Sequence, residues 1–231
     1  MKYFVSATCL VAILISGGCV KPPNTKQSKP FEVVELESSL CLLIDMSGSF
    51  GNSWEDRAHK LFLQLLDAVS ATGGGAESRV VIGQLSGNEQ VVLFEGQPNE
   101  LRRKFKSPED LNNFLLEHAD PTASKVYKSV RKIVDYAGSL NGVTNKTRMV
   151  TVVLSDMADN TQDAGEREKA KLKTLESLKE YHQRGGGLAL YYVDPDQAKH
   201  WSQLLNEAGF GVGEFVIETS LSENPRLPRL D

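Results

Sequence analysis

Hydrophobic and polar positions along the chain follow two different periods from about residue 37 onward. Continuous apolar runs such as SLCLLID (39–45) and TRMVTVVLSD (147–156) are typical of strands that are buried on both faces. Segments such as 54–72 carry an apolar residue every three or four positions, which predicts helices. The other predicted strands are 79–86, 90–96, 187–194 and 213–219, and the other predicted helices are 107–117, 124–136, 164–184 and 195–209.

The order of these elements predicts an α/β fold. Strands that alternate with helices favour a doubly wound, mostly parallel six-stranded sheet with helices on both faces. Only the residues GNE separate 79–86 from 90–96, so a hairpin makes the second strand an antiparallel edge. In sheets of this class, ligands bind where the strand order reverses, between the first and fourth strands. Those strands end at Asp45 and Asp156, which we therefore expect to lie near one another.

Oxygen-bearing side chains gather at this predicted crevice. The segment DMSGSF places Asp45, Ser47 and Ser49 at alternate positions, and Asp156 ends the fourth strand. No histidine or cysteine belongs to the pattern. Oxygen ligands suit hard cations, Mg²⁺ or Mn²⁺ with Ca²⁺ as a further option, rather than Zn²⁺ or Cu²⁺. Two carboxylates and two hydroxyls do not fill an octahedron, so water or an acidic group from another molecule must complete it.

The segment DMSGSF resembles the D-x-S-x-S signature of von Willebrand factor A (VWA) domains, which form a metal-ion-dependent adhesion site. The segment VTVVLSDM resembles the later strand of that family, which ends in the site's second aspartate, here Asp156. In element order the resemblance covers residues 37–220. The family also has a threonine just before a helix. In DPTASKVYKSV, Ser124 fits the register of that position and is favoured, with Thr122 as the substitute.

The resemblance implies a binding module and not an enzyme. In the family, the serines ligate the metal directly, the aspartates ligate it directly or through water, and a carboxylate of the partner often takes the last position. We therefore expect an unknown protein partner that binds through an acidic residue. Two alternatives stay open: a metal-assisted hydrolase, and a scaffold with a vestigial metal site. A haloacid-dehalogenase-like phosphatase needs an aspartate where Ser47 stands, and a G-x-S-x-G elbow is absent.

Simpler structural roles compete for several of these residues. Asp45 and Ser47 could merely cap the loop that starts the next helix. Asp120, which precedes a proline, is interpreted as a turn residue rather than a ligand. Asp159 and Asp163 are interpreted as a loop and a helix cap. A capping role for Asp45 would leave Asp156 unexplained, which favours the metal interpretation.

The N-terminal segment MKYFVSATCLVAILISGGCV has the pattern of a secretory signal. Lys2 precedes an apolar run at 5–15, which is too short to span a bilayer, and small residues then lead to Cys19. This arrangement resembles the lipobox of bacterial lipoproteins and implies a lipid on Cys19. Cleavage without lipid and a retained anchor stay open. The predicted organisation is a signal peptide, a lipidated cysteine with an extended tether, a VWA domain and a disordered tail, over 1–18, 19–36, 37–220 and 221–231.

Composition and charge agree with an exported binding module. Of the chain, 40% is hydrophobic and 24% is charged, as in ordinary globular proteins, and the net charge of −4 gives no indication of a nucleic-acid partner. Cys41 is the one cysteine that follows Cys19, so we expect a small buried apolar residue and no disulfide within the domain. The predicted location is the bacterial cell envelope, with the lipid anchor on the periplasmic face of the outer membrane.

Overall fold

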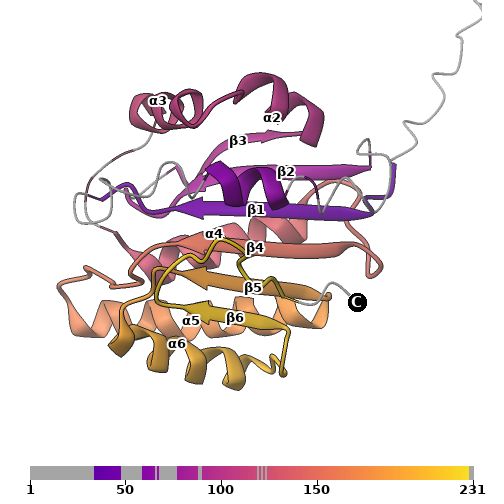
Figure 1. Cartoon of the computed structure of the whole chain (residues 1–231). Helices are drawn as coiled ribbons and strands as arrows, with labels where there is room; N and C mark the ends of the chain where they lie inside the picture. The colour runs from indigo at the N-terminus through magenta and orange to yellow at the C-terminus, as the bar shows by residue number, and fades with distance from the viewer. Residues whose placement is uncertain are drawn as a thin grey trace, which may run out of the picture. The chain divides into compact units, whose positions relative to one another are not determined.

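The computed structural model describes residues 34–47, 59–65, 67, 77–87, 90–118, 120, 122 and 124–228. In this part of the chain, six strands form one sheet in the order β3-β2-β1-β4-β5-β6. Every neighbouring pair is parallel except β2 and β3, so the predicted doubly wound sheet with an antiparallel edge is confirmed (Figure 1). The strands are β1 (Ser38–Ile44), β2 (Ser78–Gln84), β3 (Val92–Gly96), β4 (Arg148–Leu154), β5 (Gly186–Tyr191) and β6 (Phe215–Glu218).

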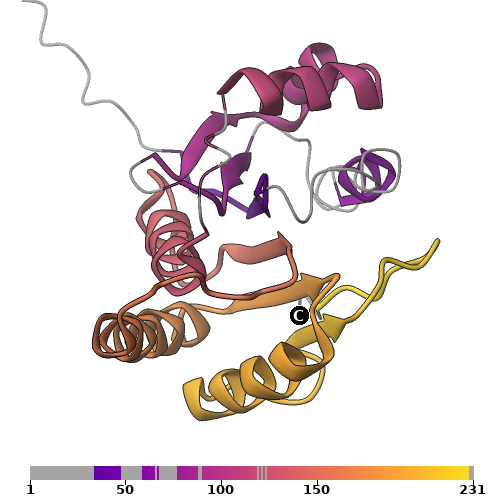
Figure 2. The same ribbon diagram turned by 90° about the vertical axis from the view of Figure 1, so that its left-hand side faces the viewer.

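Helices cover both faces of the sheet, as the alternation of elements predicted (Figure 2). On one face, Cys41 and Leu43 of β1 belong to a core shared with α4, α5 and α6. On the other face, Leu40 and Leu42 belong to a core shared with α2, α3 and the helical residues 59–65. The labelled helices are α2 (Pro98–Lys104), α3 (Pro108–His118), α4 (Val126–Ser139), α5 (Ala164–Gln183) and α6 (Pro195–Ala208).

The central position of β1 follows from its sequence. All seven of its residues, SSLCLLI, are buried, because the strand lies between β2 and β4 in the sheet and between the two helical layers. An uninterrupted apolar run is what such a strand requires, since both of its faces contact the core. The carboxyl ends of the parallel strands meet at one edge of the sheet, on the left in Figure 1.

Helix α2 is an element that the hydrophobic pattern did not predict. It has seven residues, of which only Pro98 and Leu101 are buried, so it carries little periodicity. Local capping defines it instead: Pro98 occupies the first turn, and the Glu100 carboxylate accepts the Gln97 N–H at 2.8 Å. The basic residues Arg102 and Arg103 lie in its last turn, where they interact favourably with the helix dipole.

The segment that follows β6 packs on the sheet over residues 221–228, which belong to the predicted tail. Residues 221–228 form no helix or strand, yet Leu221 is buried and Leu227 packs against the same core as β1. The Tyr191 hydroxyl donates to the carbonyl of Arg226. The Gln64 side chain also donates to the Glu223 carbonyl at 3.4 Å, and Arg226 pairs with Glu218 at 2.9 Å. These contacts hold an irregular segment on the sheet, but they are too sparse to form a pattern in the sequence.

Among the described residues, no helix combines the length and the hydrophobicity that crossing a membrane requires. The predicted signal, Cys19 and the tether up to residue 33 lie outside the described residues. Leu36, at the end of the predicted tether, is buried in the core, and its N–H donates to the Gly142 carbonyl at 2.7 Å. The predicted helix at 54–72 is described at 59–65 and at 67, where it is helical.

Candidate functional site

Asp45 lies directly after β1, at the edge of the sheet where the strand order reverses. Its side chain is 1% exposed. The Oδ1 atom accepts the Ser47 N–H at 2.9 Å and the Ser124 hydroxyl at 2.9 Å. The Oδ2 atom accepts the Ser155 hydroxyl at 2.9 Å. One buried carboxylate therefore joins three loops that are far apart in the sequence.

The register of the central strands places Ser155 opposite Asp45. Ile44 pairs with Leu154, so the next residue of each strand also lies side by side, and the Asp45 N–H donates to the Leu154 carbonyl at 2.9 Å. Asp156 is therefore one position farther out along the neighbouring strand. It is partly exposed, and its Oδ1 accepts the Ala158 N–H at 2.9 Å.

The backbone turns sharply after Asp156. Met157 has a φ of 63°, which is uncommon for a residue other than glycine, and its side chain is 1% exposed. The Met157 N–H donates to the Ser155 hydroxyl oxygen at 2.9 Å. Strained backbone at the end of a central strand is frequent at functional sites, where it directs neighbouring groups toward a ligand.

The third loop distinguishes Ser124 from Thr122. Ser124 is 1% exposed, and its hydroxyl donates to Asp45. Thr122 is exposed, and its N–H donates to the Asp120 carboxylate at 3.0 Å, which makes Asp120 a turn residue as interpreted from the sequence. Of the two hydroxyls that we considered, the one at position 124 is therefore brought to Asp45.

Two serines that the sequence did not identify also take part in the hydrogen bonds of the site. Ser155 donates to Asp45, and Ser86 accepts the Met46 N–H at 3.2 Å through its hydroxyl oxygen. Ser155 directly precedes Asp156 in the sequence, but the register of β1 and β4, which the sequence does not report, is what places it opposite Asp45. Ser86 follows β2, the other neighbour of β1. The next residue, Gly87, has a φ of 79°, and a Cβ there would lie 2.8 Å from Asp120.

The other aspartates of the long loop before α5 cap helices. Asp159 accepts the Tyr127 N–H at 3.1 Å and so caps the start of α4. Asp163 is the N-cap of α5 and accepts the Glu166 N–H. Both agree with the interpretation as loop and cap residues. Burial, followed by the charge of Asp159, raises the pKa of Tyr127 to about 12, so the phenol stays neutral near pH 7.

The buried charge of Asp45 has no basic partner in the described part of the chain. None of the ion pairs found there involves this carboxylate, although a buried charge ordinarily requires a counter-charge or a metal. Three hydrogen bonds compensate part of the lost hydration.

The donor set around Asp45 fits a hard cation. The hydroxyls of Ser124 and Ser155 donate their protons to the carboxylate, which leaves oxygen lone pairs for a ligand such as Mg²⁺ or Mn²⁺. Within the described ranges, no group of three or more histidine, cysteine, aspartate and glutamate side chains could hold a metal ion. Any cation here would therefore depend on hydroxyls as much as on carboxylates. Ser49, a further predicted ligand, lies outside the described residues.

Comparisons with known proteins give the fold and not the family. No protein-family model matches the sequence, and no curated protein matches it significantly. The pilus adhesin SpaC from Lactobacillus rhamnosus GG has a TM-score of 0.54 and 12% identity over 84% of this chain and 29% of the adhesin. The PilB minor pilin from Streptococcus sanguinis has a TM-score of 0.51 and 12% identity over 82% of this chain and 58% of the pilin.

A third solved structure, manganese-loaded TRAP protein from Plasmodium vivax, has a TM-score of 0.47 and 13% identity, and the match covers 81% of this chain and 69% of that one. The chain spans less than two thirds of the length of the two bacterial proteins. At these identities the likeness concerns the arrangement of the sheet and its helices. The chain thus has a mixed α/β fold that is also found in a pilus adhesin and a minor pilin.

Proposed function

We propose that the chain is a protein-binding module of the VWA type, which holds a divalent cation at the carboxyl end of β1 and engages a partner through that cation. The observation that carries the proposal is Asp45. Its carboxylate is 1% exposed, accepts three hydrogen bonds and lacks a basic partner among the described residues. A divalent cation beside it supplies the missing positive charge.

In this proposal the serine hydroxyls bind the cation and the carboxylates orient them. Ser47, Ser49 and Ser124 provide neutral oxygens, while Asp45 and Asp156 provide charge directly or through water. The ion is Mg²⁺ or Mn²⁺, with Ca²⁺ as a further option, because these are the cations that oxygen ligands select. Asp45 already holds the Ser124 hydroxyl at 2.9 Å, so the ligand is oriented before the cation arrives.

The partner contributes an acidic side chain. A cation that is held largely by neutral hydroxyls and water keeps much of its charge and attracts an external anion. Asp156 is partly exposed, and so it lies where the site meets solvent. The hydroxyls and carboxylates of the site suit the binding and orientation of a carboxylate, and we therefore propose a binding role rather than an enzymatic one.

We further propose that the module is displayed on the bacterial cell envelope. The signal at 1–18 and the lipid on Cys19 anchor it, and the tether at 19–36 separates the domain at 37–220 from the membrane, on the periplasmic face of the outer membrane. Two proteins that share the fold are described as a pilus adhesin and a minor pilin, which agrees with a binding role at a cell surface.

Calorimetric titration with MnCl₂ and MgCl₂ tests the metal site. We expect binding in the purified protein and its loss in Asp45→Asn. Asp110→Asn is the matched control, because Asp110 is an exposed residue in the first turn of α3 that accepts the N–H groups of Lys106 and Ser107, and the amide oxygen of asparagine can accept them as well. Binding absent below millimolar concentration, or unchanged in Asp45→Asn, would contradict the proposal and favour a scaffold with a vestigial site.

Capture of the partner tests the binding role. The lipidated protein, purified from its host without chelator, should retain a protein that EDTA releases and that added Mg²⁺ restores. Capture that is equally strong in EDTA contradicts metal-dependent engagement. Turnover of phosphate esters or peptides that requires Mg²⁺ or Mn²⁺ and is lost in Asp45→Asn would instead favour the metal-assisted hydrolase.

A further inference from the structure

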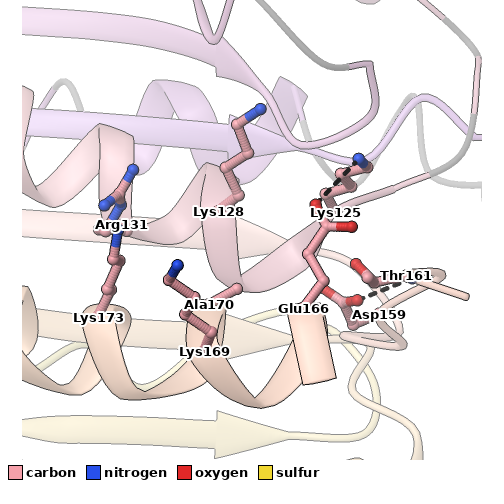
Figure 3. Close-up of a pocket in the computed structure, with 9 residues that line it drawn as sticks. All are labelled: Lys125, Lys128, Arg131, Asp159, Thr161, Glu166, Lys169, Ala170 and Lys173. Carbon is pink, nitrogen blue, oxygen red and sulfur yellow. Dashed lines mark hydrogen bonds and ion pairs between the residues drawn. The ribbon is translucent and has the colours of Figure 1, made fainter. Parts of the chain in front are cut away.

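A groove of about 250 Å³ lies between the N-terminal halves of α4 and α5 (Figure 3). Its lining is dominated by basic side chains. These residues are Lys125, Lys128, Arg131, Lys169 and Lys173. In Figure 3, Lys169 and Lys173 of α5 extend toward the part of α4 that carries Lys128 and Arg131.

Most of these positive charges are uncompensated. Lys125 pairs with Glu166 at 3.7 Å, but none of the other four forms an ion pair with any described residue. Lys128 and Arg131 are three positions apart on α4, and Lys169 and Lys173 are four apart on α5. The two residues of each pair therefore share a helix face, and their like charges repel one another. In a chain with a net charge of −4, such a concentration of positive charge indicates an anionic ligand.

The groove begins on the loops that build the candidate site. Lys125 directly follows Ser124, whose carbonyl accepts the Asn160 N–H at 2.9 Å. Asp159, which lines the groove, caps α4 and lies three residues after Asp156. The candidate site and the groove therefore share the loops that carry Ser124 and Asp159.

We propose that this groove binds an acidic segment of the protein partner, while the first carboxylate of that segment reaches the cation beside Asp45. The identity of the ligand as a protein rests on the proposed function, but the preference of the groove for anions does not. The Arg131 guanidinium suits a carboxylate because its two parallel N–H groups match the two oxygens.

The shape of the groove favours a peptide segment over an anionic membrane. Lys128 and Arg131 are half-buried and line a groove, and a groove accommodates an extended chain better than a flat layer of headgroups. Ala170 and the aliphatic parts of the lysines give the walls an apolar character that accommodates side chains. Asp159 and Glu166 at one end disfavour a ligand with charge at every position, such as a nucleic acid.

Fluorescence anisotropy with a labelled octapeptide that alternates glutamate and serine tests the inference. The double variant Lys128→Glu/Arg131→Glu should weaken binding by about tenfold or more, because two attractive charges become repulsive. Arg103→Glu/Lys106→Glu is the matched control, with the same charge change at the same spacing on the opposite side of the sheet, and should change binding by less than about twofold. Binding should also weaken as salt rises.

The outcomes separate this inference from the proposed function. Peptide binding that is unaffected by Lys128→Glu/Arg131→Glu overturns the groove, even if Mn²⁺ still binds. Peptide binding that depends on the groove in a protein that does not bind Mn²⁺ supports the groove and overturns the proposed metal site. A third measurement uses vesicles that contain phosphatidylglycerol. If binding to these vesicles depends on the groove and the peptide does not bind, the choice of a protein segment as the ligand is overturned.

Discussion

Two buried polar clusters lie on the same pair of strands, and they differ in charge. Cys41 of β1 pairs in register with Thr151 of β4, and the Thr151 hydroxyl lies 3.0 Å from the Tyr181 hydroxyl of α5. At the end of the same strands, Asp45 accepts hydroxyls from Ser124 and Ser155. We call the first the neutral cluster and the second the charged cluster.

The neutral cluster requires no ligand, because its polar groups are uncharged. Burial raises the pKa of the Cys41 thiol to about 12 and also raises the pKa of Tyr181, so both groups stay protonated near pH 7. Uncharged polar groups can satisfy one another inside a core. A carboxylate surrounded only by neutral donors keeps a net negative charge. The charged cluster therefore favours a cation as ligand, whereas the neutral cluster does not.

The largest expected effect concerns the reactivity of Cys41. Its pKa is raised from 9.0 to about 12, so at pH 8 we expect alkylation of native Cys41 by iodoacetamide to be slower by about a thousandfold than in the unfolded chain. Mass spectrometry of the peptide that contains Cys41, with and without guanidinium chloride, measures the ratio. Equal rates would show that the neutral cluster is open to solvent. The raised pKa stabilises the fold fully below pH 9, and this stability is lost as pH rises toward 12.

The next largest effect concerns the charge of Asp45. Asp45→Asn should lower the affinity for Mn²⁺ by about 100-fold, because the carboxylate positions the hydroxyls and supplies charge. In the unsubstituted protein, Mn²⁺ at 100 times its Kd should raise the Tm by about 5–11 °C. Differential scanning calorimetry should show this increase and its loss in Asp45→Asn. An equal increase in Tm in both proteins would show that Mn²⁺ binding does not depend on the charge of Asp45.

A smaller effect separates the two hydroxyls of the third loop. Ser124→Ala should lower the Mn²⁺ affinity by about tenfold, because it removes a proposed ligand whose hydroxyl Asp45 already orients. Thr122→Ala should leave the affinity within about twofold, since Thr122 is exposed. Calorimetric titration of the two variants in parallel decides the matter. The reverse order of effects would assign the ligand to Thr122.

The smallest effect concerns the neutral cluster. Tyr181→Phe removes the hydroxyl that lies 3.0 Å from Thr151 and should lower the free energy of unfolding by about 1 kcal/mol. Urea denaturation measures this loss. The Mn²⁺ affinity should not change, because the neutral cluster has no part in the proposed metal site. A loss of metal binding in Tyr181→Phe would mean that the two clusters are coupled.

The sequence was sufficient for the sheet because its signals are repeated along each element. The buried run 39–45 and the similar run 147–156 fix the central strands, and their connectivity brings Asp45 and Asp156 to neighbouring strands. Helix α2 was missed because capping by Glu100 defines it rather than periodicity. The packing of Leu221 was missed because one buried residue makes no pattern.

The candidate site was harder to predict in detail because it depends on register. A shift of one residue decides whether Ser155 or Asp156 lies opposite Asp45, and no local pattern reports that shift. The choice between Ser124 and Thr122 likewise depends on how the loop before α4 turns around Asp120. The residue types indicated a set of oxygen donors, whereas the identity of the hydroxyls that reach Asp45 required the fold.

Diffraction from crystals grown with MnCl₂, recorded near the manganese absorption edge, tests the central claim most directly. The account predicts an anomalous peak at the carboxyl end of β1, within about 2.5 Å of the hydroxyl oxygens of Ser47 and Ser124. The same peak should be absent from crystals of Asp45→Asn. No peak at this edge of the sheet, with manganese bound elsewhere or not at all, would contradict the claim that Asp45 organises a metal site.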